Sequence, residues 1–366
     1  MARPQEHIRT EHLKTHLNYL ADPELRGRSG SGSKLAGEYI KQHFERLQLE
    51  PLFEGSYFQA IPSASIGGNA RIPSGRNVGA IVRGTDPKLE NEFLLIGAHY
   101  DHLGSSGETI FPGADDNASG TSMLLEVARV LTESPVKPKR SIILIAFDLE
   151  ERMLWGSRWF VNHSPVPLEQ IKSVMIADMI GRSLGDLDLK TVFVMGSEHS
   201  PELTEALDAV PPPKGLDVAR IGVDLIGVRS DYGPFWNEQV PFLFFSTGQH
   251  PDYHKPTDTA EKIDWEQTTL VSTLILELSI RIADSERTPT WVEEVPTSIE
   301  EVKSVRQIAL RLLANENPAK PLGASQLLLL GHIKVNTAKI LDAGTVSPAD
   351  RTWLIRVAQL LLFSVL

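Results

Sequence analysis

The chain contains no cysteine among its 366 residues. This absence excludes disulfide bonds, thiolate metal sites and a cysteine nucleophile together. Any metal ion in the protein must therefore be held by histidine and carboxylate side chains. The missing disulfides do not identify a compartment, because they show only that an oxidising environment is not needed for folding.

Positive charge is also scarce, since 36 Lys and Arg stand against 47 Asp and Glu, and the formal net charge is -11. Nucleic-acid binding requires a basic face, so we expect no nucleic-acid partner. An acidic metal pocket, partly neutralised by bound cations, is consistent with this excess of negative charge.

Long hydrophobic runs are missing as well. The longest apolar stretch, residues 354–366, carries Arg356 and Gln359 and is too short to span a bilayer, so we expect no membrane span. The first residues have no apolar core of the kind that a signal peptide needs. This leaves a cytoplasmic protein and the processed form of an exported protein as alternatives.

Short apolar runs alternate with amphipathic segments along most of the chain. This alternation predicts an α/β fold with a doubly wound, mostly parallel (mixed) central sheet flanked by helices. The strands are expected at residues 77–82, 93–98, 142–147, 174–177, 191–195 and 240–246. The helices are expected at about residues 8–20, 34–47, 119–131, from 156, 201–209 and 265–283.

The Gly/Ser-rich segment at residues 26–33 separates the first two expected helices. Such a segment can cradle phosphate, but a phosphate loop needs a preceding strand and a following Lys-Ser/Thr pair, and neither is present. The sequence therefore predicts a flexible connector here.

Residues 285–290 predict a linker, so we divide the chain into a catalytic domain at 1–285 and a helical C-terminal extension at 286–366. Residues 297–300 form a capping-box pattern, and an apolar stripe follows it at helical spacing. The final helix is apolar on most of its circumference. This favours burial against its own domain, and a homo-oligomer through the C-terminal helices is the alternative.

Five side chains that could bind a metal come at or after the carboxyl ends of expected strands. In open α/β sheets ligands bind outside these strand ends, so we expect the five to lie together. Each has an ordinary explanation when taken singly, such as a loop cap or a solvated surface acid. Together they predict a metal centre with histidine and carboxylate ligands, which suits zinc better than magnesium or calcium. The five are His99, Asp116, Glu151, Asp178 and His254.

Neighbouring residues predict supporting roles. Glu150 and Glu151 are adjacent, which allows one to bind metal and the other to act as general base. Asp101 is placed to orient the ring of His99. His102 is a second candidate ligand, although a loop histidine is the favoured interpretation.

The charges of the candidate ligands are also informative. Two zinc ions bring four positive charges, and Asp116, Glu151 and Asp178 return three negative charges. The remaining charge suits a bridging hydroxide, which is the nucleophile of two-metal hydrolases.

Five motifs in order resemble the di-zinc exopeptidase family of bacterial leucyl-type aminopeptidases, aminopeptidase Y and glutamate carboxypeptidases. The resemblance runs over about residues 13–283 and does not include the C-terminal extension. The motifs are residues 97–102, residues 113–120, the Glu pair at 150–151 before Gly156, residues 178–181, and residues 253–254.

The resemblance implies a ligand set for two zinc ions. Asp116 would bridge the two ions. His99 and Asp178 would complete one shell, and Glu151 and His254 would complete the other.

The resemblance also implies catalytic roles. Glu150 would be the general base that takes a proton from the bridging water and passes it to the leaving amine, and Asp101 would support His99. Tyr253 would donate a hydrogen bond to the oxyanion. Tyr232 and Met153 depart from the family pattern and are candidates for positions near the substrate pocket.

The implied activity is a zinc-dependent aminopeptidase that removes N-terminal residues from peptide substrates. Carboxypeptidase or dipeptidase action on the same metal site is an alternative. Glutaminyl cyclisation is another, and its family members generally hold a single zinc. A receptor-like relative without activity is the alternative from a different class, but such relatives typically lose ligands or the base, and this sequence keeps both.

Overall fold

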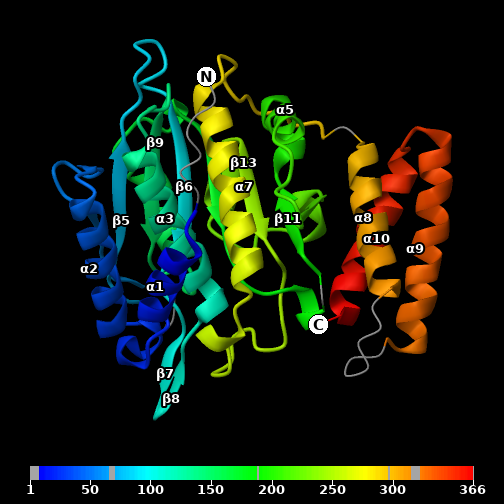
Figure 1. The fold of residues 1–366 in the computed structure, drawn as a ribbon, viewed down its shortest axis with the longest axis horizontal. Helices are drawn as coiled ribbons and strands as arrows, with labels where there is room; N and C mark the ends of the chain where they lie inside the picture. The colour runs from blue at the N-terminus through cyan, green and yellow to red at the C-terminus, as the bar shows by residue number, and fades with distance from the viewer. Residues whose placement is uncertain (1–7, 66–70, 188, 296, 315–321, 366) are drawn as a thin grey trace.

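The computed structural model describes residues 8–65, 71–187, 189–295, 297–314 and 322–365 (Figure 1). Its centre is a mixed sheet in the order β1-β5-β9-β6-β10-β13-β11-β12, with β2 also paired to β5. The strands of this sheet are β1 Glu50–Pro51, β2 Phe58–Ile61, β5 Gly75–Val82, β6 Phe93–His99, β9 Ser141–Phe147, β10 Ile171–Ala177, β11 Thr191–Met195, β12 Asp217–Arg220 and β13 Phe242–Ser246.

The middle of the sheet is parallel. Strands β9, β6, β10 and β13 run in the same direction, whereas β5 is antiparallel to β9 and β11 is antiparallel to β13. The chain passes from β6 to one neighbour, β9, and then returns to the other neighbour, β10, which makes a topological switch point beside β6. The predicted doubly wound, mixed sheet is confirmed.

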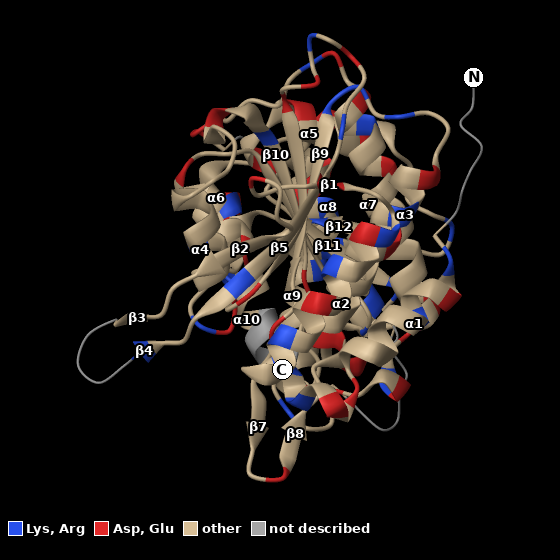
Figure 2. Ribbon diagram, turned by 90° about the vertical axis from the view of Figure 1, so that its left-hand side faces the viewer, with Lys and Arg blue, Asp and Glu red and all other residues tan. Residues whose placement is uncertain are grey.

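Helices cover both faces of this sheet, as the view in Figure 2 shows. Helices α1, α2, α3 and α7 lie on one face, and α4 and α6 lie on the other. Every residue of β6 and β9 is buried, as expected for parallel strands that are covered on both sides. The helices are α1 Thr10–Leu20, α2 Ser31–Arg46, α3 Gly120–Glu133, α4 Trp155–Asn162, α5 Pro201–Ala209, α6 Tyr232–Asn237 and α7 Trp265–Asp284.

Three further helices pack at the β12 end of the sheet (Figure 1): α8 Ile299–Leu313, α9 Ala324–Ala343 and α10 Pro348–Val365. The predicted apolar stripe of α8 is buried at Val302, Val305 and Leu312 in the same core cluster as strands of the sheet. The N-cap of α8 is Ser298, whose hydroxyl accepts a hydrogen bond from the amide of Glu300.

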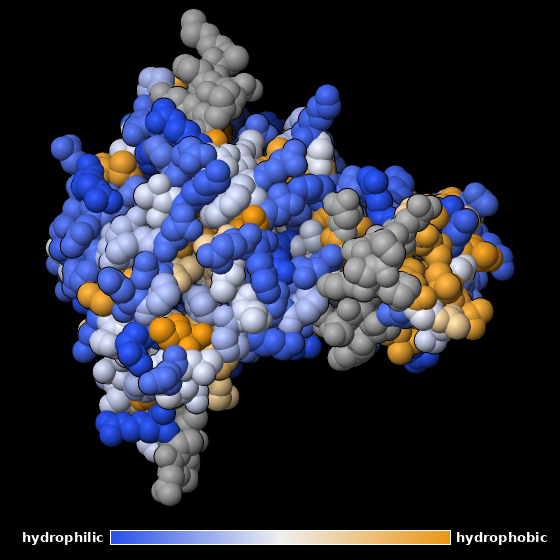
Figure 3. Space-filling model, turned by 60° about the horizontal axis from the view of Figure 1, so that its bottom comes forward, coloured by the Kyte–Doolittle hydropathy of each residue, from blue (hydrophilic) through white to orange (hydrophobic). Residues whose placement is uncertain are grey.

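The helical end of the molecule carries exposed apolar side chains (Figure 3), among them Leu327, Leu328 and Val335 of α9 and Leu360 of α10. Homo-oligomerisation through these helices stays a prediction. Within the described residues, no helix is both long enough and apolar enough to cross a bilayer.

The flexible connector predicted at residues 26–33 is wrong. Residues 23–28 form a 3-10 helix, η1 Pro23–Arg28, and α2 begins at Ser31. Arg28 is fully buried, because its guanidinium finds main-chain acceptors in distant loops. Composition could not reveal those acceptors.

Several short elements were also not predicted, because they are too short or too polar to show a period. Two small two-stranded sheets pair β3 Ala64–Ser65 with β4 Arg71–Ile72, and β7 Gly104–Ser106 with β8 Thr109–Phe111. The remaining short helices are η2 Ala114–Ser119, η3 Leu168–Gln170, η4 Leu184–Asp186, η5 Ser197–His199, η6 Val223–Leu225 and η7 Ala260–Lys262.

Two buried histidines join α1 to α2. The rings of His16 and His43 meet edge to face, with centroids 4.7 Å apart. Burial, together with the neighbouring imidazole, lowers the pKa of His16 to about 3. Burial also lowers the pKa of His43 to about 4, although its hydrogen bond to the carbonyl of Leu125 opposes the shift. Both rings are therefore neutral in the folded protein at mild pH.

These shifts predict a loss of stability in acid. Below about pH 6.5 these histidines bind protons in the unfolded chain but stay neutral in the folded chain. The free energy of unfolding therefore falls as the pH drops toward the pKa values of the folded state. We expect His43→Gln to reduce this fall by about 1 kcal/mol between pH 7 and pH 5.5. Urea unfolding in the presence of a chelator measures it, with the exposed His332→Gln as the control for losing one histidine. An unchanged pH slope in His43→Gln would contradict the prediction.

Candidate metal centre

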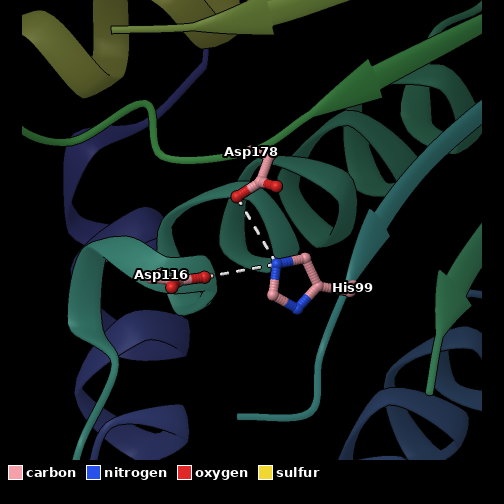
Figure 4. A group of neighbouring side chains, drawn as sticks. All are labelled: His99, Asp116 and Asp178. Atoms are coloured by element: carbon pink, nitrogen blue, oxygen red, sulfur yellow. Dashed lines mark ion pairs between the residues drawn. The ribbon is translucent and has the colours of Figure 1, made fainter. Parts of the chain in front are cut away.

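The structure brings the five predicted ligands together at the carboxyl ends of the parallel strands. His99 is the last residue of β6, and Asp178 follows β10 directly. Asp116 lies in η2, Glu151 follows β9, and His254 lies on the loop after β13. Figure 4 shows Asp116 and Asp178 pointing toward the same nitrogen of His99.

The ligand atoms form two groups that share Asp116. In the first, Nε2 of His99 lies 3.3 Å from Oδ1 of Asp116 and 3.4 Å from Oδ1 of Asp178. In the second, Nε2 of His254 lies 3.1 Å from Oδ2 of Asp116 and 3.3 Å from Oε2 of Glu151. The two oxygens of one carboxylate thus face different groups.

These separations fit a zinc site. Ligand atoms about 2.0–2.2 Å from a tetrahedral zinc ion lie about 3.3 Å from one another. Among the atoms of the five candidate ligands, three are buried without a hydrogen-bond partner: Nε2 of His99, Oδ1 of Asp178 and Oε1 of Glu151. A buried polar atom without a partner is costly, and a cation in each of the two groups would satisfy all three.

The electrostatics of the cluster also favour a cation. Burial alone would lower the pKa of His99, but the carboxylates of Glu150 and Asp178 raise it well above its usual value. In the same way, hydrogen bonds to Asp116 and Glu151 overcome burial and raise the pKa of His254 to about 10. The carboxylates therefore create a negative potential strong enough to hold protons on imidazoles. A metal ion would replace those protons.

Glu150 lies beside this cluster and does not join either group. Burial raises the pKa of its carboxyl group well above the usual range, His99 opposes the shift, and Asp178 and Asp231 add to it. The side chain lines a cavity together with Asp116 and Asp178. This is where a proton-transferring group next to a metal site would have to be.

Asp101 connects His99 to the Glu pair. The Nδ1 atom of His99 is hydrogen-bonded to the main-chain oxygen of Asp101 at 3.2 Å and lies 3.6 Å from its carboxylate. That carboxylate accepts hydrogen bonds from the amides of Glu150 and Glu151. One side chain thereby fixes the loop that carries both glutamates.

The segment that carries Asp116 is held by hydrogen bonds to the side chains of Asp258 and Asn117. The carboxylate of Asp258 accepts hydrogen bonds from the amides of Asp115 and Asp116. The side-chain amide of Asn117 donates to the carbonyl of Ala177, and its oxygen accepts from the amide of Gly120 at the start of α3. These bonds fix the bridging carboxylate relative to β10 and α3.

Arg28 also supports these loops, and the sequence analysis did not identify it. Its guanidinium donates to the carbonyls of Leu20, Tyr100 and Pro112, and also to those of Gly113 and Asp116. Burial lowers the pKa of Arg28 to about 10, and nearby carboxylates, led by Asp116, limit the shift. The side chain therefore stays charged at neutral pH.

A cavity of about 500 Å³ opens beside the ligands. Asp116, Glu150, Asp178 and His254 line one end, and the rest of the wall is mainly apolar. Most of the apolar wall comes from Leu154, Met179, Leu184, Phe193, Met195, Ile221, Leu225, Ile226, Val228 and Phe244, with Gln359 contributed by α10.

Three residues that the family resemblance pointed to occupy different positions around the cavity. Tyr253 lines it and stacks on the ring of His254, with centroids 3.8 Å apart. Tyr232 is fully buried behind the wall, and its hydroxyl donates to the carbonyl of Gly227 and accepts from the amide of Arg229. Met153 is 61% exposed and is not a lining residue. Tyr232 therefore shapes the cavity from behind, through its loop and through its ring, which packs on Phe244 of the wall with centroids 4.6 Å apart.

The sequence model of peptidase family M28 matches residues 77–279, which is more than half of the chain. The match includes all five candidate ligands. The chain belongs to peptidase family M28. The matched region includes most of β5 and the central strands from β6 to β13, and the C-terminal helices lie outside it.

Curated relatives match part of the chain. Aminopeptidase YwaD of Bacillus subtilis is 28% identical over 222 residues, which cover 56% of this chain and 44% of that protein. A probable zinc metalloprotease of Pyrenophora teres f. teres is 29% identical over 174 residues, which cover 46% of this chain and 34% of the relative. The chain spans less than half the length of either relative.

Solved structures resemble the chain over a larger share of its length, at lower sequence identity. LapB from Legionella pneumophila has a TM-score of 0.61 at 24% identity, covering 76% of this chain and 74% of LapB. Glutaminyl cyclase from Porphyromonas gingivalis has a TM-score of 0.58 at 18% identity, covering 74% of this chain and 98% of the cyclase. At these identities the likeness establishes the fold alone, so the activity has to be argued from the site.

The buried guanidinium generates a prediction about the whole site. We expect Arg28→Lys to lower the free energy of unfolding by about 3 kcal/mol or more, because an ammonium group cannot reach acceptors spread over several loops and leaves buried carbonyls unsatisfied. Urea unfolding of the apoprotein measures the loss. Arg26→Lys, an exposed position in the same segment, is the matched control and should change stability by less than about 0.5 kcal/mol. Equal stability of the two variants would contradict the role given to Arg28.

Proposed function

We propose that this protein is a zinc-dependent aminopeptidase that hydrolyses N-terminal residues from peptides. The observation that carries the proposal is the shared carboxylate of Asp116 between two ligand groups, next to Glu150 in a largely apolar cavity. The names of relatives such as aminopeptidase YwaD support the same activity.

Two zinc ions per chain are part of the proposal. Histidine and carboxylate ligands without cysteine suit zinc, and the name of the Pyrenophora relative points to the same metal. His99 and Asp178 would hold one ion, Glu151 and His254 the other, and Asp116 would contact both. The two oxygens of Asp116 facing separate groups support a count of two rather than one.

Bound zinc would act as a Lewis acid and lower the pKa of a coordinated water. The residues of the chain supply the remaining chemistry. Glu150 accepts a proton from the attacking water and donates it to the leaving amine. Tyr253 donates a hydrogen bond to the oxygen of the attacked carbonyl as negative charge develops on it. Asp101 acts as a positioning residue through the amides of Glu150 and Glu151.

The charges around the cavity favour binding of a peptide by its amino terminus. With Asp116 and Asp178 bound to zinc, the carboxylate of Glu150 remains to attract a protonated amine, and the apolar wall suits the first side chain of the peptide. Apart from His254, Arg229 is the only basic residue among the described residues that line the cavity. A clamp for a peptide carboxylate would therefore lack a second arginine or lysine. This argues against carboxypeptidase action.

The division into a catalytic domain at 1–285 and an extension at 286–366 remains a proposal. The extension contributes to the cavity, because the side chain of Gln359 in α10 lines it and donates to the carbonyl of Leu225. We infer that the extension forms part of the substrate pocket and not an independent unit.

The role of Glu150 can be tested with an aminoacyl-anilide substrate. We expect Glu150→Gln to lower kcat by about 100-fold to 10,000-fold while zinc content stays that of the wild type, because the amide cannot carry the proton. Glu108→Gln, at an exposed turn between β7 and β8, is the control and should keep full activity. Near-full activity of Glu150→Gln with zinc bound would refute the proposed base.

The substrate class can be tested with peptides whose termini are free or blocked. We expect a peptide with a free N-terminal Leu to be cleaved, and its N-acetylated form to be inert. A peptide with N-terminal Glu should be at least about tenfold slower, since a carboxylate is costly in an apolar wall. Release of C-terminal residues, or loss of ammonia from N-terminal Gln, would instead favour the carboxypeptidase or cyclase alternative.

A further inference from the structure

His102 is a buried histidine beside the metal centre that the proposed ligand set does not use. It follows His99 by three residues, and its side chain is 0% exposed. Among the described residues neither ring nitrogen of His102 has a hydrogen-bond partner. An imidazole in this condition is costly unless something outside the protein satisfies it.

The ring points at the second ligand group. Its Nδ1 atom lies 2.8 Å from Oε1 of Glu151 and 3.9 Å from Oδ2 of Asp116. Its centroid is 5.9 Å from that of His254, a ligand of the same group. His102, Asp116 and Glu151 thus offer three ligand atoms close enough to share one ion.

The short approach to Glu151 lacks hydrogen-bond geometry. Nδ1 of His102 and Oε1 of Glu151 are 2.8 Å apart, yet neither atom has a hydrogen-bond partner. Two close atoms that are not aligned for a hydrogen bond with each other can both be satisfied by a cation to which both of their lone pairs point. A metal ion meets this need.

The backbone around His102 fixes the ring in this position. The amide of His102 donates to the carbonyl of Arg28, whose guanidinium holds the loop of Asp116. Gly113 packs directly against the ring, since a Cβ atom there would lie 2.5 Å from Cδ2 of His102. Its positive φ of +58 likewise favours glycine. The ring is therefore held rigidly against the cluster.

We propose that Nδ1 of His102 is a sixth protein ligand of the metal centre, in the group of Asp116, Glu151 and His254. This inference rests on the proposed metal centre and not on the proposed substrate. The two shells would then differ, with two imidazoles in one and a single imidazole in the other. Because imidazole nitrogen suits zinc well, the shell with His99 and Asp178 should lose its metal first during dialysis.

Proton NMR of the cobalt(II)-substituted protein tests the proposal. Each imidazole bound to cobalt gives a strongly shifted ring N–H signal that disappears in D2O, so the signals count the histidine ligands. We expect three such signals in the wild type and two in His102→Gln. His43→Gln removes another buried imidazole and should keep three. The wild-type count decides the question even if His102→Gln does not fold.

Metal affinity gives a second measurement. In competition with a chromophoric chelator, we expect His102→Gln to bind one of its two zinc ions at least about 100-fold more weakly, and His43→Gln to match the wild type. His102→Asp, which keeps a ligand atom, should recover part of the affinity.

Two outcomes would overturn the proposal. Two shifted signals in the wild type, with or without a loss of affinity in His102→Gln, would make His102 a positioning residue for Glu151. No uptake of cobalt or zinc by the wild type would overturn this inference together with the proposed metal centre. Three signals in a protein that cleaves no peptide would sustain the ligand and refute only the proposed function.

Discussion

The buried guanidinium of Arg28 is the interaction on which the geometry of the metal centre depends. It gathers carbonyls from the end of α1, the loop after β6 and the segment that carries Asp116. A desolvated cation among several carboxylates is stable only where both are hydrogen-bonded, and here the positive charge lies behind the acidic cluster. These hydrogen bonds hold the loops that present the ligands, which reduces the reorganisation that metal binding requires.

The same loops concentrate negative charge at the switch point of the sheet. Asp116, Glu151 and Asp178 meet there because β6, β9 and β10 are neighbours and end at the same edge. Like charges in a buried site repel, and a proton on His254, whose pKa the carboxylates raise to about 10, would partly offset them. Divalent cations would do so more completely. The fold thus places unbalanced negative charge at this site, which the proposed zinc ions would neutralise.

The strand-end ligands could be predicted from the sequence, because buried parallel strands show as apolar runs and their carboxyl ends face one crevice. His99 and Asp178 follow directly from this rule. Arg28 and His102 could not be assigned in the same way. Arg28 lies in a Gly/Ser-rich segment and acts on carbonyls far away in the sequence, whereas the role proposed for His102 depends on ring orientation. Periodicity reports which face is buried, not which atoms meet there.

The cavity wall shows where family membership stops being informative. The family match ends at residue 279, yet Gln359 of α10 lines the cavity and is tied to the loop at Leu225. That loop continues to Gly227 and Arg229, which the hydroxyl of Tyr232 holds from behind. The ligand cluster and the wall are thus built by different parts of the chain. Substitutions in α10 can therefore alter the space for the first side chain of a peptide while leaving the metal ligands unchanged, so chains with the same strand-end motifs can differ in specificity.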